Sequence, residues 1–443
     1  MADVRQTVIE LLGQLGSSRE ARQYLKQFSR VEESRFAVVK VGGAVMRDDI
    51  DELAAALAFL HRLGLTPIVL HGAGPQLDEA MAAAGVAIER HEGLRVTTEE
   101  VMAVARPVIY RANARLVDAL EARGVRARGL LHGVFNARLA DPERLGLVGE
   151  IDSVELEGVR SAIRSGALPV VACLGESPSG QVMNINADFA ARELVWAVKP
   201  HKVIFLTGTG GLLDHRGRVI SAISLVNDYD HLLAQDWIHS GMRLKLTQIR
   251  ELLEGLPSDA SVSITSAANL TRELFTHTGA GTLIRRGEII EFHERVPAER
   301  LSEVETLLEN SFDQHLRPDW LEGRVVRGLL IAESGRAAAL LIAGVDGIPY
   351  LDKFVVTPEA QGEGLGAALW QAVRQHCPQL YWRARAGNPI AGWYFQQSHT
   401  THRKGQWIVY TIGITEHEQL SRLAEDAAGR DSGWKTGSAS EHE

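Results

Sequence analysis

The chain has 443 residues, 45% of them hydrophobic and 23% charged, and its formal net charge at pH 7 is −9. Such a length predicts two domains, and the negative charge argues against a nucleic-acid partner. The two cysteines, Cys173 and Cys377, lack metal-ligand spacing, the N-terminus has no signal-peptide core, and no apolar run is long enough to span a membrane. These features predict a cytoplasmic protein without disulfides, a metal site or a membrane partner.

Residues 1–30 are predicted to form a helical segment. Ser17 and Glu20 have the spacing of a capping box. An apolar stripe follows on Ala21, Tyr24, Leu25 and Phe28. Such a stripe must be buried against this subunit or another one.

Residues 31–290 alternate between short β-rich apolar runs and helix-like stretches. This alternation predicts an α/β domain with a mainly parallel sheet between two layers of helices, and active sites at the carboxyl ends of its strands. The predicted strands are Phe36–Val41, Thr66–Leu70, Leu168–Cys173, Val203–Thr207 and Ser261–Ile264. The predicted helices include Ile50–Leu63, Glu100–Arg123, Phe189–Val198 and Met242–Leu253.

Residues 291–425 are predicted to form a smaller α+β domain. A helix over Val296–Phe312 precedes three strand-like runs, and a glycine-rich turn then leads into a helix-like run, Ala367–Val373. The strand-like runs are Gly328–Ile331, Ala337–Ala343 and Tyr350–Val356. Residues 426–443 are polar and are predicted to be a disordered tail.

Glycine-rich loops follow the first two predicted strands, as Val39-Lys40-Val41-Gly42-Gly43 and His71-Gly72-Ala73-Gly74-Pro75. A single glycine after a strand is usually only a tight turn. Two such loops on neighbouring strands, one of them with a lysine, indicate an anion site, because glycines let backbone N–H groups approach a phosphate. Two helix starts add polar groups, in Asn184-Ile185-Asn186-Ala187-Asp188 and Gly241-Met242-Arg243-Leu244-Lys245.

Together with Gly93-Leu94-Arg95-Val96-Thr97, these segments resemble, in order, those of the amino-acid kinase family and, within it, the N-acetylglutamate kinases. The resemblance covers about Phe36–Ile284 and implies that family's fold. It implies that Lys40 and Lys245 contact the transferring phosphoryl group and that Asp188 orients both lysines. Four glycines would supply backbone donors, and an arginine and an asparagine would hold the α-carboxylate and acetamido end of N-acetylglutamate. These substrate-binding residues are Gly42, Gly43, Gly72, Gly74, Arg95 and Asn184.

The implied chemistry suits these residue types. The γ-carboxylate of N-acetylglutamate is ionised at neutral pH, so no general base is needed. Phosphoryl transfer from ATP requires lysines, backbone N–H groups and Mg²⁺, the ion being held mostly by nucleotide phosphates and water. One position departs from the family pattern, because Gly208 stands where these kinases usually place an aspartate. The resemblance therefore says least about the nucleotide side.

Each of these residues also has a non-catalytic interpretation. Taken singly, Lys40 would be a solvated lysine at a strand end, Asp188 a helix cap and Arg95 a surface charge. The five segments in family order favour the catalytic interpretation.

In the smaller domain, Gln361-Gly362-Glu363-Gly364-Leu365-Gly366 lies between a strand and a helix. It resembles the loop with which Gcn5-related acetyltransferases (GNAT) hold the pyrophosphate of acetyl-coenzyme A. Further segments extend the resemblance, over about Val296–Ile414, to the acetyltransferase domain of vertebrate-like N-acetylglutamate synthases. These segments are Leu351-Asp352-Lys353-Phe354, Tyr381-Trp382-Arg383-Ala384-Arg385, Asn388-Pro389-Ile390 and Trp393-Tyr394-Phe395.

The second resemblance implies an acetyl-coenzyme A site and a glutamate site. Tyr394 would protonate the leaving thiolate, directly or through water, while the sequence shows no obvious general base. The coenzyme would be bound by Gln361, Gly362, Gly364, Leu365 and Gly366. Glutamate would be held by Lys353, Phe354, Arg383, Arg385 and Asn388. Without the resemblance, the aromatic run would be core and the two arginines a solvated strand face.

The two resemblances together imply a bifunctional enzyme for the first two steps of arginine biosynthesis. It would transfer the acetyl group of acetyl-coenzyme A to L-glutamate and phosphorylate N-acetyl-L-glutamate with ATP. They also imply regulation by L-arginine, bound beside the N-terminal helix near Gly279–Thr282, and a homotetramer. Three alternatives stay open: a synthase whose kinase-like domain only binds arginine, a kinase with an inactive acetyltransferase domain, and a non-catalytic arginine sensor.

Overall fold

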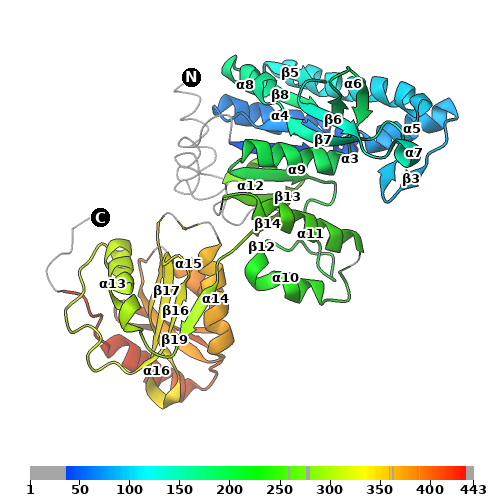
Figure 1. Cartoon of the computed structure of the whole chain (residues 1–443). Coiled ribbons are helices and arrows are strands. Elements are labelled where there is room, and N and C mark those ends of the chain that lie inside the picture. The colour runs from blue at the N-terminus through cyan, green and yellow to red at the C-terminus, as the bar shows by residue number, and fades with distance from the viewer. Residues whose placement is uncertain are drawn as a thin grey trace. The chain divides into compact units, whose positions relative to one another are not determined.

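The computed structural model describes residues 36–238, 240–257, 260–275, 280–358, 360–361, 364–388 and 390–435. The chain divides into two compact units, with the boundary between Arg286 and Gly287 (Figure 1). The predicted helical segment 1–30 lies outside the described residues. None of the helices in the described part of the chain combines the length and the apolar character that crossing a bilayer requires.

The first unit is built on an eight-stranded sheet in the order β12-β14-β13-β11-β1-β2-β8-β5. Its neighbouring strands are parallel except β13 and β14, which are antiparallel. Most strands are short aliphatic runs, as expected for a sheet that is buried on both faces. They are β1 (Ala37–Val41), β2 (Ile68–His71), β5 (Ala127–Leu130), β8 (Leu168–Ala172), β11 (Lys202–Leu206), β12 (Ala222–Ser224), β13 (Ser261–Thr265) and β14 (Thr282–Arg285).

Helices cover both faces of this sheet, and each face has its own hydrophobic core (Figure 1). One layer holds α3 (Gly43–Asp48), α4 (Ile50–Arg62), α5 (Gly74–Ala84), α6 (Glu99–Glu121) and α12 (Leu270–Phe275). The other holds α8 (Glu157–Arg164), α9 (Ala187–Val198), α10 (Leu225–Leu233) and α11 (Ser240–Glu254). Along β1, Val39 and Val41 enter the first core and Val38 enters the second. Lys40 is two residues from Val38 in the strand, so its side chain points to the same face of the sheet, toward the layer of α9.

A four-stranded sheet, in the order β10-β9-β6-β7, and the hairpin β3–β4 complete the first unit, and neither was predicted. Their strands have only two to six residues, too few for a clear period-two pattern. They place Asn184 and Arg95 beside the ends of the main strands. The elements are β3 (Arg90–His91), β4 (Leu94–Arg95), β6 (Phe135–Leu139), the short helix α7 (Pro142–Leu145), β7 (Gly149–Val154), β9 (Leu174–Glu176) and β10 (Val182–Asn184).

The second unit contains a seven-stranded sheet in the order β15-β16-β17-β18-β19-β21-β20. Neighbours are antiparallel except β18 and β19, which pair in parallel only at Tyr350 and Tyr381. Helices α13 (Ala298–Phe312) and α16 (His417–Gly429) pack on one face, and α14 (Leu365–His376) and α15 (Ala391–Gln397) on the other. The strands are β15 (Ile290–His293), β16 (Val326–Ala332), β17 (Ala337–Ile342), β18 (Tyr350–Val356), β19 (Leu380–Arg385), β20 (Thr400–Lys404) and β21 (Trp407–Ile412), and a 3-10 turn, η2 (Val345–Gly347), precedes β18.

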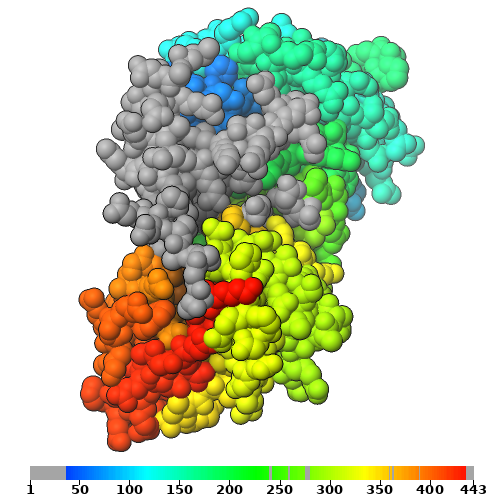
Figure 2. All heavy atoms as spheres, turned by 90° about the vertical axis from the view of Figure 1, so that its left-hand side faces the viewer, coloured from blue at the N-terminus to red at the C-terminus, as the bar shows by residue number. Residues whose placement is uncertain are grey.

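The prediction of a disordered tail was wrong for residues 426–435. Helix α16 continues to Gly429, and the C-terminal strap, Arg430–Lys435, follows it along the surface of the second unit (red in Figure 2). Arg317 N donates to Gly433 O at 3.0 Å, and Lys435 N donates to His315 O at 2.9 Å. The polar composition is misleading because main-chain hydrogen bonds, the Arg317–Asp431 ion pair and the packing of Trp434 on Phe312 together hold this segment. Residues 436–443 lie outside the described part of the chain.

The predicted fold class is confirmed. The first unit has a mainly parallel sheet between two helical layers, and the second is a smaller α+β unit. This topology gathers the polar segments of the first unit at the carboxyl ends of β1 and β2.

Two candidate active sites

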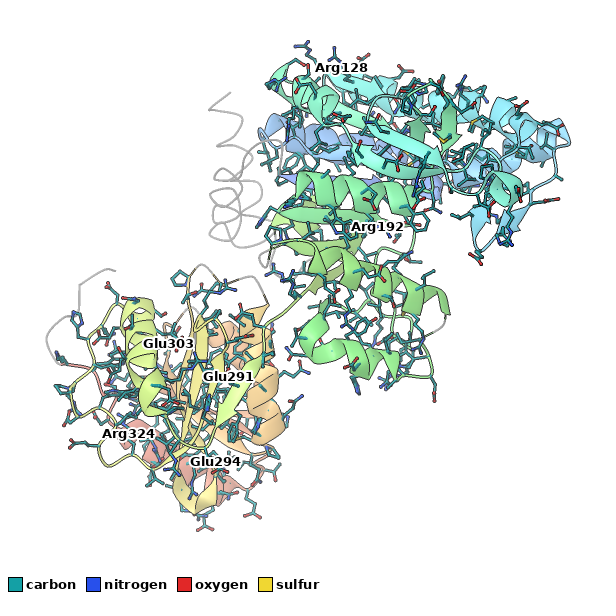
Figure 3. All side chains as sticks on the ribbon, in the orientation of Figure 1. Arg128, Arg192, Glu291, Glu294, Glu303 and Arg324 are labelled. Carbon is teal, nitrogen blue, oxygen red and sulfur yellow. The ribbon has the colours of Figure 1, made fainter. Side chains whose placement is uncertain are left out.

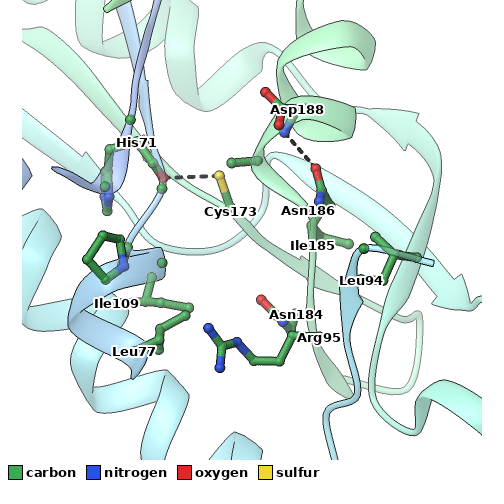
Figure 4. A pocket seen from close by; sticks show the side chains of 18 of the residues that line it. His71, Leu77, Leu94, Arg95, Ile109, Cys173, Asn184, Ile185, Asn186 and Asp188 are labelled. Carbon is green, nitrogen blue, oxygen red and sulfur yellow. Dashed lines mark hydrogen bonds between the residues drawn. The ribbon is translucent and has the colours of Figure 1, made fainter. Parts of the chain in front are cut away.

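The carboxyl ends of β1 and β2 open into a pocket of about 220 Å³ (Figure 4). Both glycine-rich loops line it, together with the β3–β4 hairpin and residues 184–188. Asp188 and Asn186 lie at one end, and Arg95 and Asn184 lie at the other (Figure 4). The parallel topology thus brings together four segments that are far apart in the sequence.

Lys40 and Asp188 line this pocket, and Lys245 lies close enough to both to interact with their charges. Lys40 Nζ lies 2.7 Å from Asp188 Oδ1, and the Lys40 side chain is only 17% exposed, so it is not a solvated surface lysine. Lys245, on α11, is half-buried and lies within range of both other charges. Burial lowers the pKa of Lys245, the charge of Lys40 lowers it further, and Asp188 raises it. Two ammonium groups around one carboxylate leave this end of the pocket positive.

Asp188 is not the cap of its helix, so that alternative interpretation is wrong. The Asn186 side chain caps α9, accepting from Asp188 N at 2.8 Å and from Phe189 N at 3.3 Å. The Asp188 carboxylate is thereby left to pair with Lys40 in the first turn of α9, where the helix dipole favours negative charge.

The prediction that four glycines supply free backbone donors needs correction at two of them. Gly42 N donates to Leu206 O at 3.3 Å and Gly72 N donates to Val41 O at 3.0 Å, so these amides extend the sheet ladder. Gly43 and Gly74 instead begin α3 and α5, and first-turn amides have no acceptor within a helix. The two loops also touch, because a Cβ at Gly43 would lie 2.6 Å from Pro75 Cδ and 2.7 Å from Gly74 N.

Arg95 and Asn184 lie together at the opposite end of the pocket (Figure 4). Arg95 Nη2 donates to Asp78 Oδ1, and the Arg95 side chain is 9% exposed. Its Nη1 is buried and has no hydrogen-bond partner among the described residues. Asn184 Nδ2 donates to Thr97 Oγ1 at 3.1 Å. A guanidinium with a spare buried nitrogen beside an amide is suited to receive a carboxylate.

His71 ends β2 and is buried beside this pocket. Asn113 Nδ2 donates both to His71 Nε2 at 3.0 Å and to Val170 O at 2.9 Å, so the ring proton lies on His71 Nδ1. Burial lowers the pKa of His71 to about 4, which makes the imidazole neutral at physiological pH. Cys173 Sγ donates to the His71 carbonyl at 3.0 Å (Figure 4). These bonds fix the strand end that leads into Gly72.

In the second unit, Tyr394 lies inside a cluster of aromatic side chains. Its ring centroid is 5.6 Å from that of Trp382 and 5.5 Å from those of Trp393 and Tyr410. Tyr394 is 7% exposed, and burial raises its pKa above the ordinary value for tyrosine. The phenol therefore stays protonated at neutral pH, as a proton donor must.

Lys353 and Arg383 are both bound to the C-terminal region of the chain itself. Lys353 Nζ donates to Asp352 Oδ2 at 2.7 Å and to Ser432 O at 3.0 Å. Arg383 donates to three carbonyl oxygens, those of Ala427, Ala428 (3.0 Å) and Arg430 (2.6 Å). Arg383 is therefore not on a solvated strand face. Burial lowers the pKa of Lys353, while Asp352 raises it.

The other residues predicted to hold glutamate lie nearer the surface. Arg385 is exposed, with its guanidinium 5.8 Å from the Trp407 ring centroid. Asn388 is exposed, and its Oδ1 accepts from Ile390 N at 3.1 Å, just before α15. Phe354 stacks on Trp393 at 5.7 Å. The side chain next to Tyr394, Phe395, is 66% exposed, so the core interpretation of the aromatic run fails there.

The predicted coenzyme loop leads into α14. Gly364 has φ +82°, a left-handed conformation that glycine adopts without strain, and it caps the helix. Leu365 and Gly366 occupy the first turn, whose amides have no acceptor within the helix. Gln361 is exposed, and Gly362 lies outside the described residues.

The sequence reasoning missed Asp78, Arg90 and Thr97, which lie in or beside the first pocket. Arg90 and Arg95 pair across the hairpin that turns at Gly93. Two arginines on either side of a glycine turn are the sequence pattern that could have indicated this pair. Gly208, where the family pattern departs, is not among the residues that line the pocket.

Two family models match the chain. The amino acid kinase family matches residues 35–266, and the N-acetyltransferase domain of N-acetylglutamate synthase matches residues 290–430. An acetylglutamate kinase from Xanthomonas campestris is 46% identical over 420 residues, which cover 94% of this chain and 99% of that protein. The human mitochondrial N-acetylglutamate synthase is 31% identical over 436 residues, which cover 96% of this chain and 78% of that protein.

One solved structure shares the fold of both units. It is the N-acetylglutamate synthase from Neisseria gonorrhoeae, complexed with coenzyme A and N-acetyl-glutamate. The TM-score is 0.61 over 89% of this chain and 98% of that one, at 20% sequence identity. At this identity the likeness concerns the fold alone.

Proposed function

Because the chain belongs to the amino acid kinase family and also carries the N-acetyltransferase domain of N-acetylglutamate synthase, we propose that it is a bifunctional transferase of arginine biosynthesis. The second unit acetylates L-glutamate with acetyl-coenzyme A, and the first phosphorylates the γ-carboxylate of N-acetyl-L-glutamate with ATP. The observation that carries the proposal is the Lys40–Asp188 ion pair, which shares one pocket with Arg95 and Asn184 and interacts electrostatically with Lys245.

In the kinase reaction, Lys40 and Lys245 stabilise the phosphoryl group in transit. Negative charge spreads over its equatorial oxygens, and preorganised ammonium groups and the amides at Gly43 and Gly74 offset that charge. Asp188 holds Lys40 in place through the 2.7 Å ion pair. Mg²⁺ would be held mostly by the nucleotide phosphates and water.

The acceptor is placed from the other end of the pocket. Arg95 Nη1 and the Asn184 amide receive the α-carboxylate and the acetamido group, so that the γ-carboxylate extends toward the lysines. That carboxylate is a nucleophile without further deprotonation, and no general base is required.

In acetyl transfer, Tyr394 donates its phenolic proton to the leaving thiolate, directly or through water. Burial raises the pKa of Tyr394, so the phenol carries its proton at neutral pH but is a weaker acid than an exposed tyrosine. Lys353, Arg383, Arg385 and Asn388 would bind glutamate, whose two carboxylates match a set of cations.

The residues of the second unit fit acetyl-coenzyme A. Gly364 turns the chain into α14, and the free amides of its first turn suit a pyrophosphate. Strands β18 and β19 part after Tyr350 and Tyr381, which leaves unpaired backbone groups beside Tyr394's aromatic cluster. Acetyl-coenzyme A would supply the activated acyl group when bound by these residues.

We also propose L-arginine as an effector and a homotetramer as the assembly, both from the family resemblance. Glu273 is buried and accepts hydrogen bonds from Ala280 N at 2.9 Å and Gly281 N at 3.0 Å, so these two residues are held against α12. Deleting residues 1–30 should abolish the response to arginine. An unchanged response would rule the site out.

The test is to assay the purified full-length chain separately, with ATP plus N-acetylglutamate and with acetyl-coenzyme A plus glutamate. Turnover in both assays is the expected result. Acetyl transfer alone would mean that the kinase-like unit is a regulator, and phosphoryl transfer alone would mean an inactive acetyltransferase unit. Arginine binding without turnover of either substrate would indicate a sensor.

A further inference from the structure

The acceptor end of the kinase pocket contains an acidic residue between two arginines. Arg95 Nη2 donates to Asp78 Oδ1, and Arg90 Nη2 lies 3.3 Å from Asp78 Oδ1 and 3.2 Å from Oδ2. Asp78 comes from α5, and the arginines pair with each other across β3 and β4. One carboxylate therefore serves two guanidinium groups.

The charge balance of this trio matters for an anionic acceptor. Asp78 alone would neutralise Arg95, and a dianion approaching a chain of net charge −9 would then meet no compensating charge at this end of the pocket. Arg90 raises the sum of the three charges to +1. It lines the pocket and is 51% exposed, so it acts through its field rather than through a buried contact.

We propose that Arg90 is a specificity-determining residue of the acceptor site, because it restores the positive charge that Asp78 removes from Arg95. This inference rests on the proposed kinase function. Asp78 orients Arg95 so that its Nη1 is left for the α-carboxylate. Arg90 gives the three residues a net positive charge, which attracts the anion. An acceptor with an uncharged α-group would gain less from Arg90, because only its more distant γ-carboxylate would feel that charge.

The test compares Arg90→Gln, Asp78→Asn and the double variant by steady-state kinetics. Arg90→Gln should raise KM for N-acetylglutamate about three- to tenfold, as expected for loss of one partly screened charge, with kcat and KM for ATP within about twofold. That rise should shrink as ionic strength increases, which a merely structural role would not produce. Adding Asp78→Asn should recover much of the loss, because Arg95 then keeps its charge.

Arg138→Gln is the matched control, since Arg138 pairs with Glu150 and Asp152 and does not line the pocket. An unchanged KM in Arg90→Gln, or a double variant no better than Arg90→Gln, would overturn the inference. If the wild type shows no phosphoryl transfer, the proposed function fails. The same comparison is then made on Kd for N-acetylglutamate by calorimetry of the full chain, and equal Kd values reject the role of Arg90.

The C-terminal strap supports a second inference from different contacts. Ser432 O accepts from Lys353, and Arg430 O accepts from Arg383 together with the last carbonyls of α16. Carbonyl and carboxylate oxygens are the same kind of acceptor for these cations. The chain thus takes up bonding positions that glutamate carboxylates need.

Specific contacts hold the strap down. Arg324, marked in Figure 3, donates to Asp431 O at 3.0 Å, and Arg317 pairs with the Asp431 carboxylate. Trp434 packs against Phe312 with ring centroids 5.3 Å apart. Trp434 also touches the proposed site, because Lys353 Nζ lies 5.6 Å from its ring centroid. Asp431 and Phe312 are not among the residues proposed to bind glutamate, so the strap is loosened through these two.

We infer that the strap is a removable cover of the acetyl-acceptor site, whose carbonyls compete with glutamate for Lys353 and Arg383. This inference rests on the proposed acetyl transfer. Only the fraction of molecules in which the cover is open can bind glutamate, so a competing cover lowers the apparent affinity for glutamate. Loosening the strap must then tighten glutamate binding, whereas a purely structural segment predicts the opposite.

The test uses Asp431→Asn with Phe312→Ala, which removes the ring that Trp434 packs on, and Glu418→Gln as a control on the exposed face of α16. KM for glutamate should fall about three- to tenfold in the strap variant, while kcat for phosphoryl transfer stays within about twofold. Amide hydrogen exchange at Gly433 and Lys435 should become faster. An unchanged or raised KM for glutamate would overturn the inference. If the wild type has no acetyl transfer, the proposed function fails. The inference about the strap is then tested by calorimetric titration with glutamate, which the strap variant must bind more tightly than the wild type.

Discussion

Lys40 and Asp188 stand 148 positions apart in the sequence, and their side chains meet at 2.7 Å. Asn186 caps α9, so Asp188 is not needed to start its helix. Asp188→Asn should therefore leave the free energy of unfolding within about 1 kcal/mol of wild type and lower kcat for phosphoryl transfer by roughly 10²-fold or more, because Lys40 loses the group that orients it. Urea denaturation and initial-rate assays check this, and a large loss of stability would contradict it.

Lys40→Ala and Tyr394→Phe should separate the two activities. Removing one preorganised donor costs about 10²–10³ in kcat, so Lys40→Ala should lose phosphoryl transfer while acetyl transfer persists. Tyr394→Phe removes only a hydroxyl and should lower acetyl transfer about 10²-fold or more, with the kinase rate unchanged. Both assays are run on the same preparation. Joint collapse of the activities in a folded Lys40→Ala protein would refute the two-site model.

Gly43→Ala should damage the kinase site by steric contact. The added Cβ would lie 2.6 Å from Pro75 Cδ and 2.7 Å from Gly74 N, so the two loops must move apart. We expect a loss of about 1–3 kcal/mol in the free energy of unfolding and a large fall in kcat for phosphoryl transfer. Gly208→Ala is the control, because nothing lies within 4 Å of its added Cβ. Equal effects of the two substitutions would argue against the close contact of the loops.

His71 should make stability depend on pH. Burial lowers its pKa from 6.5 to about 4 in the folded protein, so between these values the unfolded chain binds more protons. Stability therefore falls as pH decreases from 6.5 to 4, by about 3 kcal/mol from this group. His71→Gln can still accept from Asn113 and should lack this part of the decline. Parallel stability–pH curves for the two proteins would contradict the prediction.

The main sheet and the residues at the centre of the kinase pocket could be predicted from the sequence. The first strands and their loops have strong local signals, and the carboxyl-end rule then places Lys40, Asp188 and Arg95 at one pocket. Strand parity places the Lys40 side chain on the face of the sheet that α9 covers, because Lys40 alternates with Val39 and Val41. The pairing with Asp188 itself is expected only from the family resemblance.

Other parts of the sites could not be read from local patterns. Hairpin β3–β4 has two residues in each strand, so the trio of Arg90, Arg95 and Asp78 depends on tertiary placement. The strap is held partly by its main-chain carbonyls, which every residue has, and partly by Asp431 and Trp434, whose partners are distant in the sequence. A polar composition alone therefore suggests disorder there. The amides of Gly42 and Gly72 are used in strand pairing, which no local pattern in the sequence reveals.

The alternation of Lys40 with valines on β1 also bears on how the chain reaches its native state. A slip of β1 by one residue against β2 and β11 would drive an ammonium ion into the aliphatic layer beneath α4 and α6 and turn a valine toward the pocket. An unpaired buried charge costs several kcal/mol, so such misregistered molecules are strongly disfavoured. Lys40 therefore also favours the correct register of the central strand. In that register its charge already lies at the pocket, where phosphoryl transfer requires it.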